Sequence, residues 1–374
     1  ILQPQHLEQI KVILEKWDLA PAVIGHVVED GLVRILDGET QVAEVPVQLL
    51  TDPPLYRLKG VKPLKLQEDQ KADLATIPLP PSSPSEVLLK LLASPNLSSR
   101  EMVYRQYDHQ VGINTVVAPG QGDAAVLRIR GTSRSIALTV DGSGRYCSLD
   151  PYMGGAIAVA EACRNLACVG AEPIAITDCL NFGDPTRPEV YYQMEECIKG
   201  IAAACRALDV PVVSGNVSLY NETAGLGVYP TPVIGALGLL KETDRACVSG
   251  FQREGDLVLL LGASQFDNNP VHLAGSEYLE SVHSQVLGQP TVILDKEVHL
   301  QRLCRQAISV GLLSSAHDCA EGGLGVALAE SCIQGNIGLV GTLTPTGRWD
   351  VALFGESQSR IVVSLPSENL SALE

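Results

Sequence analysis

Apolar residues occur in two patterns along this chain: at the spacing typical of helices, and in short runs typical of strands. Apolar residues at helical spacing predict helices over residues 6–16, 150–169 and 188–208. A further helix is expected within 291–318, ahead of a short strand, and another within 321–333 after a glycine pair. Short apolar runs predict strands, at residues 22–28, 32–36, 124–129, 135–140, 173–177, 210–213, 256–262 and 360–365. The mixed order of these elements predicts an α+β fold that is α/β-like in places.

The turn residues between the first two apolar runs predict a hairpin. Asp30 and Gly31 form a pair that is common in tight β-turns, and they stand between the runs at 22–28 and 32–36. We therefore expect these two runs to pair with each other as antiparallel strands.

A proline-rich stretch divides the chain. Residues 52–86 contain seven of the 23 prolines and several serines, which predicts a linker or an extended connection and not a packed element. The expected units are therefore 1–51, 87–243 and 244–374.

Two predicted strands pass into small polar residues in matching ways. The stretches "PIAITDCLNFG" and "VPVVSGNVSLYN" both run from apolar to polar positions, and the helix predicted over 188–208 connects them as a crossover. Strands joined in this way can lie side by side, with their carboxyl ends at one rim of the sheet. Ligands commonly bind at such rims in α/β proteins. Asp178 and Asn216 are expected to share this rim.

The residue types at this rim suit a metal-bound phosphate. A carboxylate from Asp178 and an amide oxygen from Asn216 are hard ligands of the kind that magnesium prefers. Gly215 would let a phosphate or a nucleobase approach the backbone, and Ser218 could donate a hydroxyl to a phosphate. The alternative is a pair of Asx turns without function.

A glycine pair in "AHDCAEGGLGVALAES" is a third candidate. Gly322 and Gly323 at the start of a helix could expose backbone N–H groups to an anion. The alternative is that they only permit close helix packing. His317 and Asp318 are adjacent in sequence, and their spacing does not predict a catalytic pair.

Composition and charge narrow the possible functions. The 374 residues carry a net charge of −16, which argues against non-specific binding to nucleic acid or to an anionic membrane. The ten cysteines form no C-x-x-C motif, and several (Cys163, Cys197, Cys205 and Cys332) occupy apolar helical positions. Free, buried thiols favour a reducing cytosol. P-loop, Rossmann and G-x-C-x-G motifs are absent, so a nucleotide site of those kinds or an internal glutaminase is not expected.

Longer motifs resemble a known enzyme family. The stretches "YRQYDHQVGINTV", "ITDCLNFGDPTRPEVYYQMEECIKGIAAACRALDVPVVSGNVSLYNET", "AHDCAEGGLGVALAESC" and "LFGESQSR" occur in order over nearly the whole chain. Together they closely resemble the synthetase subunits of phosphoribosylformylglycinamidine synthase, within the aminoimidazole-ribonucleotide-synthetase-like superfamily of ATP users.

The resemblance implies a ligase of purine biosynthesis that forms a C–N bond. In the family, ATP activates the formamide oxygen of formylglycinamide ribonucleotide, and ammonia then displaces phosphate to give formylglycinamidine ribonucleotide. The ammonia comes from glutamine through a separate glutaminase subunit, with a small linker subunit in the same complex. ATP and Mg²⁺ are the implied cofactors, and the cytoplasm is the implied location.

The resemblance also assigns roles at the predicted rim. Asp178 and Gly215 match family positions that contact ATP, Asn216 matches a magnesium ligand, and Ser218 matches a substrate contact. These are the residues that the strand-end pattern had selected.

The family's full-length chain is an internal duplication, and this sequence resembles part of it. Residues 1–51 correspond to the end of the first half, 87–243 to the second-half N-type domain, and 244–374 to a second-half C-type domain truncated at its C-terminal end. The family's catalytic histidines lie in the first half. Thr139 stands where the other copy has a basic residue, and "DGSGRYC" contains no histidine, so the 374-residue chain alone is expected to be inactive.

Three alternatives remain open from the sequence. The chain could be another ATP-using kinase of the same superfamily, although those kinases are shorter and not duplicated. It could be a structural half that holds an auxiliary nucleotide. It could also be a scaffold for partner subunits that binds no nucleotide.

Overall fold

The computed structural model describes residues 1–262, 269–342 and 347–373. By its internal contacts the chain separates into two units, residues 1–57 and 58–374.

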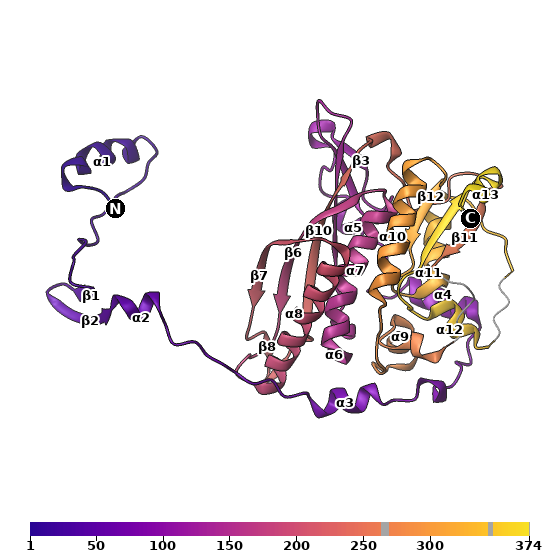
Figure 1. Ribbon diagram of the computed structural model, residues 1–374, viewed down its shortest axis with the longest axis horizontal. Coiled ribbons are helices and arrows are strands. Elements are labelled where there is room, and N and C mark those ends of the chain that lie inside the picture. The colour runs from indigo at the N-terminus through magenta and orange to yellow at the C-terminus, as the bar shows by residue number, and fades with distance from the viewer. Residues whose placement is uncertain (263–268, 343–346, 374) are drawn as a thin grey trace. The chain divides into compact units, whose positions relative to one another are not determined.

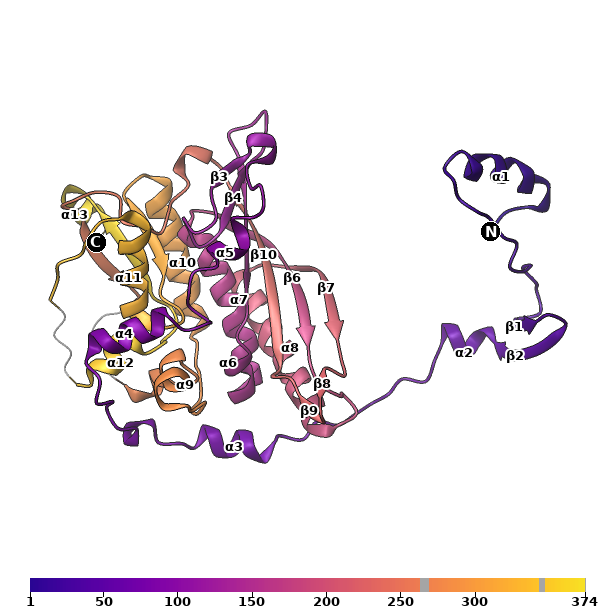
Figure 2. The same ribbon diagram turned by 180° about the vertical axis from the view of Figure 1, so that it is seen from behind.

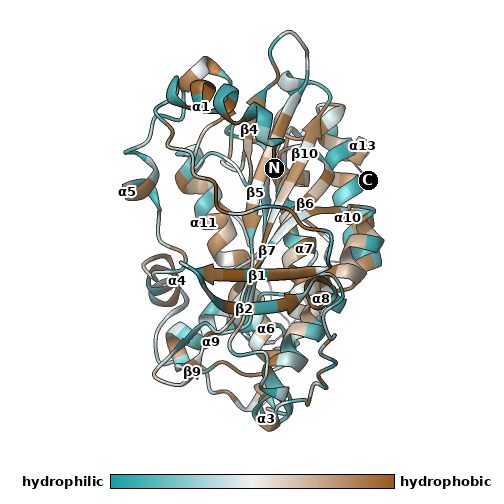
Figure 3. Cartoon of the chain, turned by 90° about the vertical axis from the view of Figure 1, so that its left-hand side faces the viewer, coloured by the Kyte–Doolittle hydropathy of each residue, from teal (hydrophilic) through white to brown (hydrophobic). Residues whose placement is uncertain are grey.

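Residues 1–57 form small elements without a core. They comprise helix α1 (Leu7–Glu15), the antiparallel strands β1 (Leu32–Asp37) and β2 (Thr40–Pro46), and helix α2 (Val47–Thr51). No residue of this unit is buried, and all of its residues are described. Figure 3 shows β1 coloured as hydrophobic along most of its length.

The hairpin predicted in this unit is wrong in one strand. Residues 22–28 form no strand, and the predicted strand at 32–36 pairs instead with 40–46. Gly38 and Glu39 supply the turn between the two strands, with Gly38 at a φ of +60° that glycine adopts without strain. Residues 1–57 thus contain two Asp-Gly pairs, and pairing across the later one leaves residues 22–28 without a partner.

Eleven helices form in the described part of residues 58–374, with bounds as follows: α3 (Leu64–Gln70), α4 (Pro84–Leu92), α5 (Glu101–Tyr104), α6 (Gly144–Leu149), α7 (Pro151–Cys168), α8 (Pro188–Leu208), α9 (Glu277–His283), α10 (Leu294–Ser309), α11 (Gly323–Gly335), α12 (Trp349–Phe354) and α13 (Leu370–Leu373). The predicted helices over 150–169 and 188–208 are confirmed as α7 and α8. Asp150 caps α7 by accepting a hydrogen bond from the backbone N–H of Met153, and Pro151 occupies its first position.

The stretch at 52–86 is not wholly extended. It contains α3, whose Leu66 is buried, and a 3₁₀ turn at Leu74–Thr76 whose Leu74 is also buried. Hydrogen bonds add to this burial, since the Gln70 side chain donates to the carbonyl of Leu149 at 2.7 Å.

A six-stranded sheet forms the first half of this unit. Its strands, in sheet order, are β3 (Thr115–Val117), β4 (Ala125–Arg128), β5 (Ser135–Asp141), β10 (Thr231–Leu240), β6 (Glu172–Asn181) and β7 (Val212–Ser218). Only the β6–β7 pair is parallel, and the crossover helix α8 connects these two strands. A short hairpin, β8 (Glu222–Thr223) with β9 (Leu226–Gly227), follows β7.

Helices α7 and α8 cover one face of this sheet (Figure 1). Alternate residues of β10 are buried beneath them, and the main apolar core lies there. The two helices approach closely at glycines: a Cβ on Gly200 would lie 1.9 Å from the carbonyl oxygen of Tyr152. A Cβ on Gly155 of α7 would likewise lie 2.4 Å from the carbonyl oxygen of Cys197, so the two helices can approach this closely only at glycines.

The opposite face of the sheet is open within the described residues. Leu138 and Val140 on β5 point to this face, because their neighbours Ala137 and Thr139 point toward α7. They remain 42% and 70% exposed. No helix of the described residues covers them. Exposed apolar positions on one sheet face are typical of a surface that binds another protein segment.

A three-stranded antiparallel sheet forms the second half, in the order β11 (Leu257–Leu261), β13 (Ile361–Leu365) and β12 (Ser315–Asp318). Helix α10 lies between this sheet and α7, as the views in Figures 1 and 2 both show. Helix α7 therefore belongs to the packing of both halves.

All ten cysteines are free, and eight of them are buried. Among the described residues, no helix is both long enough and apolar enough to cross a membrane.

Candidate functional site

The candidate site lies on strands β6 and β7, which extend further than the sequence predicts. The predicted strands end at residues 177 and 213, whereas β6 continues to Asn181 and β7 to Ser218. The polar residues are thus part of the sheet and not of loops beyond it. Parallel pairing explains the difference, since Asp178 pairs with Gly215 and Asn181 pairs with Ser218. Inter-strand hydrogen bonds can hold polar residues extended at a sheet edge, whatever their preference for turns.

Asp178 and Gly215 are in direct contact. A Cβ added to Gly215 would lie 2.3 Å from Oδ1 of Asp178, so the carboxylate occupies the space that a side chain would fill. Burial raises the pKa of Asp178, and no hydrogen bond or neighbouring charge in the described residues opposes that rise. A half-buried carboxylate without a partner can accept a hydrogen bond from a ligand, or it can bind a cation.

Asn216 and Ser218 lie on the other face of the sheet. Asn216 neighbours Cys179, and its amide nitrogen is 3.7 Å from the Cys179 sulfur. Successive residues of a strand point to opposite faces, so the side chains of Asp178 and Asn216 diverge. They share the sheet edge, as expected, but not one side of it. One magnesium ion cannot contact both side chains directly.

The loops that follow β6 and β7 are joined to each other. The backbone N–H of Phe182 donates to the carbonyl of Ser218 at 3.0 Å, and that of Tyr220 donates to Gly183 at 3.0 Å. The Ser218 hydroxyl donates to Oδ1 of Asn221 at 3.2 Å. Arg187, at the start of α8, donates to Glu222 in the β8–β9 hairpin at 3.1 Å. The ends of the two strands therefore form one connected edge.

A buried group of carboxylates lies nearby and was not expected from the sequence. Asp141 ends β5 and lies across β10 from Asp178, because both pair with Ile234 from its two sides. Burial, followed by the charges of Glu321 and Asp318, raises the pKa of Asp141. A polar residue that ends an apolar strand, as Asp141 does, is the sequence signal that could have identified it.

Helix α7 supplies another member of this group. Burial first, and then the charge of Asp141, raises the pKa of Glu161. Asn165, one turn further on, donates to Asp141 at 3.0 Å. The pKa of Asp318 is also raised, to about 6, mainly by burial, although the Arg164 guanidinium lowers it. A cation would lower these pKa values. However, the described residues contain no group of three or more His, Cys, Asp or Glu side chains arranged to hold a metal.

The glycine pair at the start of α11 serves packing. The backbone N–H of Gly322 already donates to the Glu356 carboxylate at 2.7 Å. A Cβ on Gly323 would lie 2.6 Å from the carbonyl oxygen of Gly355. Burial, as the largest effect, raises the pKa of Glu356 to about 7. The helix start is thus occupied by a carboxylate of the same chain. The His317 ring lies beside the Asp123 carboxylate, to which the Asp318 backbone N–H also donates, and the Asp318 side chain accepts from Arg164.

Comparison with known families identifies both halves of the larger unit. Residues 121–240 match the family model "AIR synthase related protein, N-terminal domain", and residues 253–374 match the corresponding C-terminal domain. The chain belongs to the AIR synthase related family. The first match takes in both strands of the candidate site, and the order of the two domains is that of the family.

Within this family the chain is similar to PurL subunits. It is 51% identical over 363 residues to "Phosphoribosylformylglycinamidine synthase subunit PurL" of Moorella thermoacetica, covering 96% of this chain and 49% of the relative. The subunit of the same name from Thermosynechococcus vestitus is 48% identical over 377 residues, covering 97% of this chain and 49% of the relative. The chain thus spans about half the length of the curated relatives that it matches.

Solved structures agree with this assignment. "T. maritima PurL complexed with ATP" matches with a TM-score of 0.60 and 25% identity, over 97% of this chain and 50% of that chain. "T. maritima PurL complexed with FGAR" matches with a TM-score of 0.61 and 25% identity, over 97% of this chain and 49% of that chain. The predicted fold class and the predicted resemblance are both confirmed.

Proposed function

We propose that this chain works in the ATP-dependent conversion of formylglycinamide ribonucleotide to formylglycinamidine ribonucleotide, the fourth step of de novo purine synthesis. Its curated relatives carry the name of that synthase, and the similar T. maritima PurL structures are titled as complexes with ATP and with FGAR. The observation that carries the proposal is the unpartnered Asp178 carboxylate against Gly215, on the parallel strand pair at the sheet edge.

The proposed roles of the four residues follow from where they lie. Asp178 would accept hydrogen bonds from a nucleotide, and Gly215 would let that nucleotide approach the backbone of β7. On the other face, Asn216 would offer its amide oxygen to magnesium, and Ser218 would contact the substrate. Magnesium held by Asn216 would neutralise the charge of a phosphate on that same face of the sheet. The residues proposed to contact the nucleotide therefore lie on one face of the sheet. The residues proposed to contact magnesium and substrate lie on the other.

The proposed partners are those of a multi-subunit ligase. Ammonia would come from glutamine through a separate glutaminase subunit, with a small linker subunit in the same complex and a cytoplasmic location. A similar solved structure is titled "Structure of PurLQS from Thermotoga maritima" and matches with a TM-score of 0.61 and 26% identity. The open apolar face of the six-stranded sheet is available for a further domain or subunit.

Replacing Asp178 with asparagine is expected to raise the Kd of the 374-residue chain for Mg-ADP about tenfold or more, because a charged hydrogen-bond acceptor becomes neutral. The rise in melting temperature with increasing Mg-ADP measures this change. Gly215→Ala is expected to act in the same direction, since its Cβ would displace the Asp178 carboxylate.

Glu189→Gln is the matched control, because Glu189 is an exposed carboxylate in the first turn of α8. It should leave the effect of Mg-ADP unchanged. An unchanged Mg-ADP effect in Asp178→Asn would contradict the proposed nucleotide contact. If Mg-ADP does not raise the melting temperature of the original chain, the scaffold reading is favoured instead.

The 374-residue chain alone is expected to show no turnover of formylglycinamide ribonucleotide with ATP and ammonia. Residues 141–147, "DGSGRYC", contain no histidine. The family resemblance places Thr139 where the other copy has a basic residue. A phosphate-release assay with the purified chain measures this, with a full-length PurL subunit as the positive control. Turnover above background would refute the expectation.

A further inference from the structure

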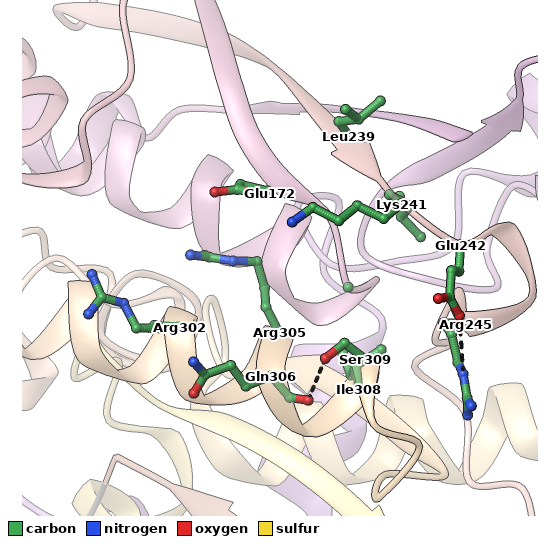
Figure 4. Close-up of a pocket in the computed structure, with 12 residues that line it drawn as sticks. Glu172, Leu239, Lys241, Glu242, Arg245, Arg302, Arg305, Gln306, Ile308 and Ser309 are labelled. Carbon is green, nitrogen blue, oxygen red and sulfur yellow. Dashed lines mark hydrogen bonds and ion pairs between the residues drawn. The ribbon is translucent and has the colours of Figure 1, made fainter. Parts of the chain in front are cut away.

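A cavity of about 400 Å³ lies away from the candidate site, between α10 and the opposite ends of β6 and β10. Its walls come from Glu172 at the start of β6, Lys241 just after β10, and Arg302 and Arg305 on α10 (Figure 4). Leu239 and Ile308 add apolar surface. The volume is within the usual range for small-ligand sites and exceeds what a single phosphate group needs.

Three cations at this cavity have no counter-ion in contact. Within the described residues, the side chains of Lys241, Arg302 and Arg305 form no hydrogen bond or ion pair. Arg245, also at the cavity, is 3.8 Å from Glu242 and points away from the other cations in Figure 4. Lys241 extends toward the space between Glu172 and Arg305 in that view. This cluster is positive, although the whole chain carries a charge of −16.

Arg305 is the central group of this cluster. It is half-buried, and burial lowers the pKa of its guanidinium, although the charge of Glu172 raises it. A desolvated guanidinium without a hydrogen-bonded partner is unfavourable unless an anion approaches it. A guanidinium offers parallel N–H donors that match the oxygens of a phosphate, and an ammonium group adds a point charge beside it.

We propose that this cavity binds a small phosphate monoester, such as a sugar phosphate or nucleoside phosphate, with its phosphate between Lys241 and Arg305. The three unpaired cations and Glu172 together carry a net charge of about +2, which matches a phosphate monoester dianion near neutral pH. Glu172 accepts a hydrogen bond from a hydroxyl of the sugar. Leu239 and Ile308 contact its apolar surface. The site is separate from the strand edge that holds Asp178 and Asn216.

Binding of inorganic phosphate and of ribose 5-phosphate to the 374-residue chain tests the proposal by titration calorimetry. Ribose 5-phosphate is expected to bind about tenfold more tightly than phosphate, because the cavity contacts the sugar as well. Arg305→Gln should raise the Kd for both probes about tenfold or more, since it removes a charged, two-pronged donor. Arg305→Lys should recover part of the loss.

Arg206→Gln is the matched control, because it removes the same charge from an exposed position on α8. It should leave both Kd values unchanged, and so should Asp178→Asn, which separates this test from that of the nucleotide contact. The proposal would be overturned by absent binding of both probes. Equal losses in Arg305→Gln and Arg206→Gln, or equal affinity for phosphate and ribose 5-phosphate, would also overturn it.

Discussion

Replacing Arg164 with methionine is expected to lower the free energy of unfolding of the chain by about 3–5 kcal/mol, the usual effect of removing one partner of a buried ion pair. Arg164 lies on α7 with a side chain that is 0% exposed. It donates to Glu297 on α10 at 2.5 Å, and its Nε donates to Asp318 on β12. It also donates to Gln358 at 3.0 Å.

The size of this effect follows from what the substitution leaves behind. Without Arg164, the carboxylates of Glu297 and Asp318 would remain buried without the cation that they share. The pKa of Asp318 would rise above its value of about 6, because burial would then act without the opposing guanidinium. Since Arg164 joins the N-terminal AIR synthase related domain to the C-terminal one, its loss weakens the packing between them. Urea unfolding at a fixed pH measures the change.

The control for this prediction is Arg206→Met, which removes an exposed arginine from α8. It should change the free energy of unfolding by less than about 0.5 kcal/mol. Adding Glu297→Gln and Asp318→Asn to Arg164→Met should recover part of the stability, because the unpaired charges are then removed as well. A loss below about 1 kcal/mol in Arg164→Met would show that the buried network does not stabilise the fold.

Replacing His317 with glutamine is expected to destabilise the chain by about 3 kcal/mol at pH 6, and by less at pH 9. The two ring nitrogens of His317 lie 2.6 Å from an Asp123 oxygen and 3.0 Å from a Glu330 oxygen. Burial by itself lowers the pKa of His317, but these two carboxylates outweigh burial and raise it well above the usual value. The imidazolium is therefore the favoured form at neutral pH.

The direction of the pH dependence follows from this raised pKa. A histidine whose pKa is higher in the folded state contributes its full stability below the unfolded pKa of about 6.5. That contribution is lost as the pH rises through the folded-state value. Urea unfolding of both proteins at pH 6 and pH 9 measures the difference. His299→Gln, at an exposed position on α10, is the control and should show no such change. A His317→Gln effect that is equal or larger at pH 9 would contradict this account.

Local sequence signals were sufficient to predict a helix where the residues at its ends include a cap or a first-turn proline. Helix α7 begins at Asp150 and Pro151, a cap and a first-turn proline that are legible from sequence. Helix α8 follows the apolar spacing of its residues and was predicted with the bounds that it has. Four strands of the six-stranded sheet, β4, β5, β6 and β7, were also predicted from apolar runs, whereas β3 and β10 were not.

The two strands of the candidate site, β6 and β7, have bounds that local sequence signals did not predict. Ser214, Gly215 and Asn216 favour turns, so the sequence predicted that the strand would end at 213. Pairing with β6 extends it to Ser218. The reverse happened at 22–28, where an apolar run predicted a strand but no described segment pairs with it. A strand forms only with a partner, and the partner is set by the tertiary structure.

By itself the sequence determined the α+β class, the main helices, the family resemblance and the choice of Asp178, Gly215, Asn216 and Ser218 as candidates. The tertiary structure alone decided that these side chains divide between two faces of one sheet edge. It also decided that Arg164 and His317 would join residues more than 100 positions apart in the chain. Periodicity and capping act over a few residues, whereas burial, pairing of charges and the walls of a cavity depend on segments that only folding brings together.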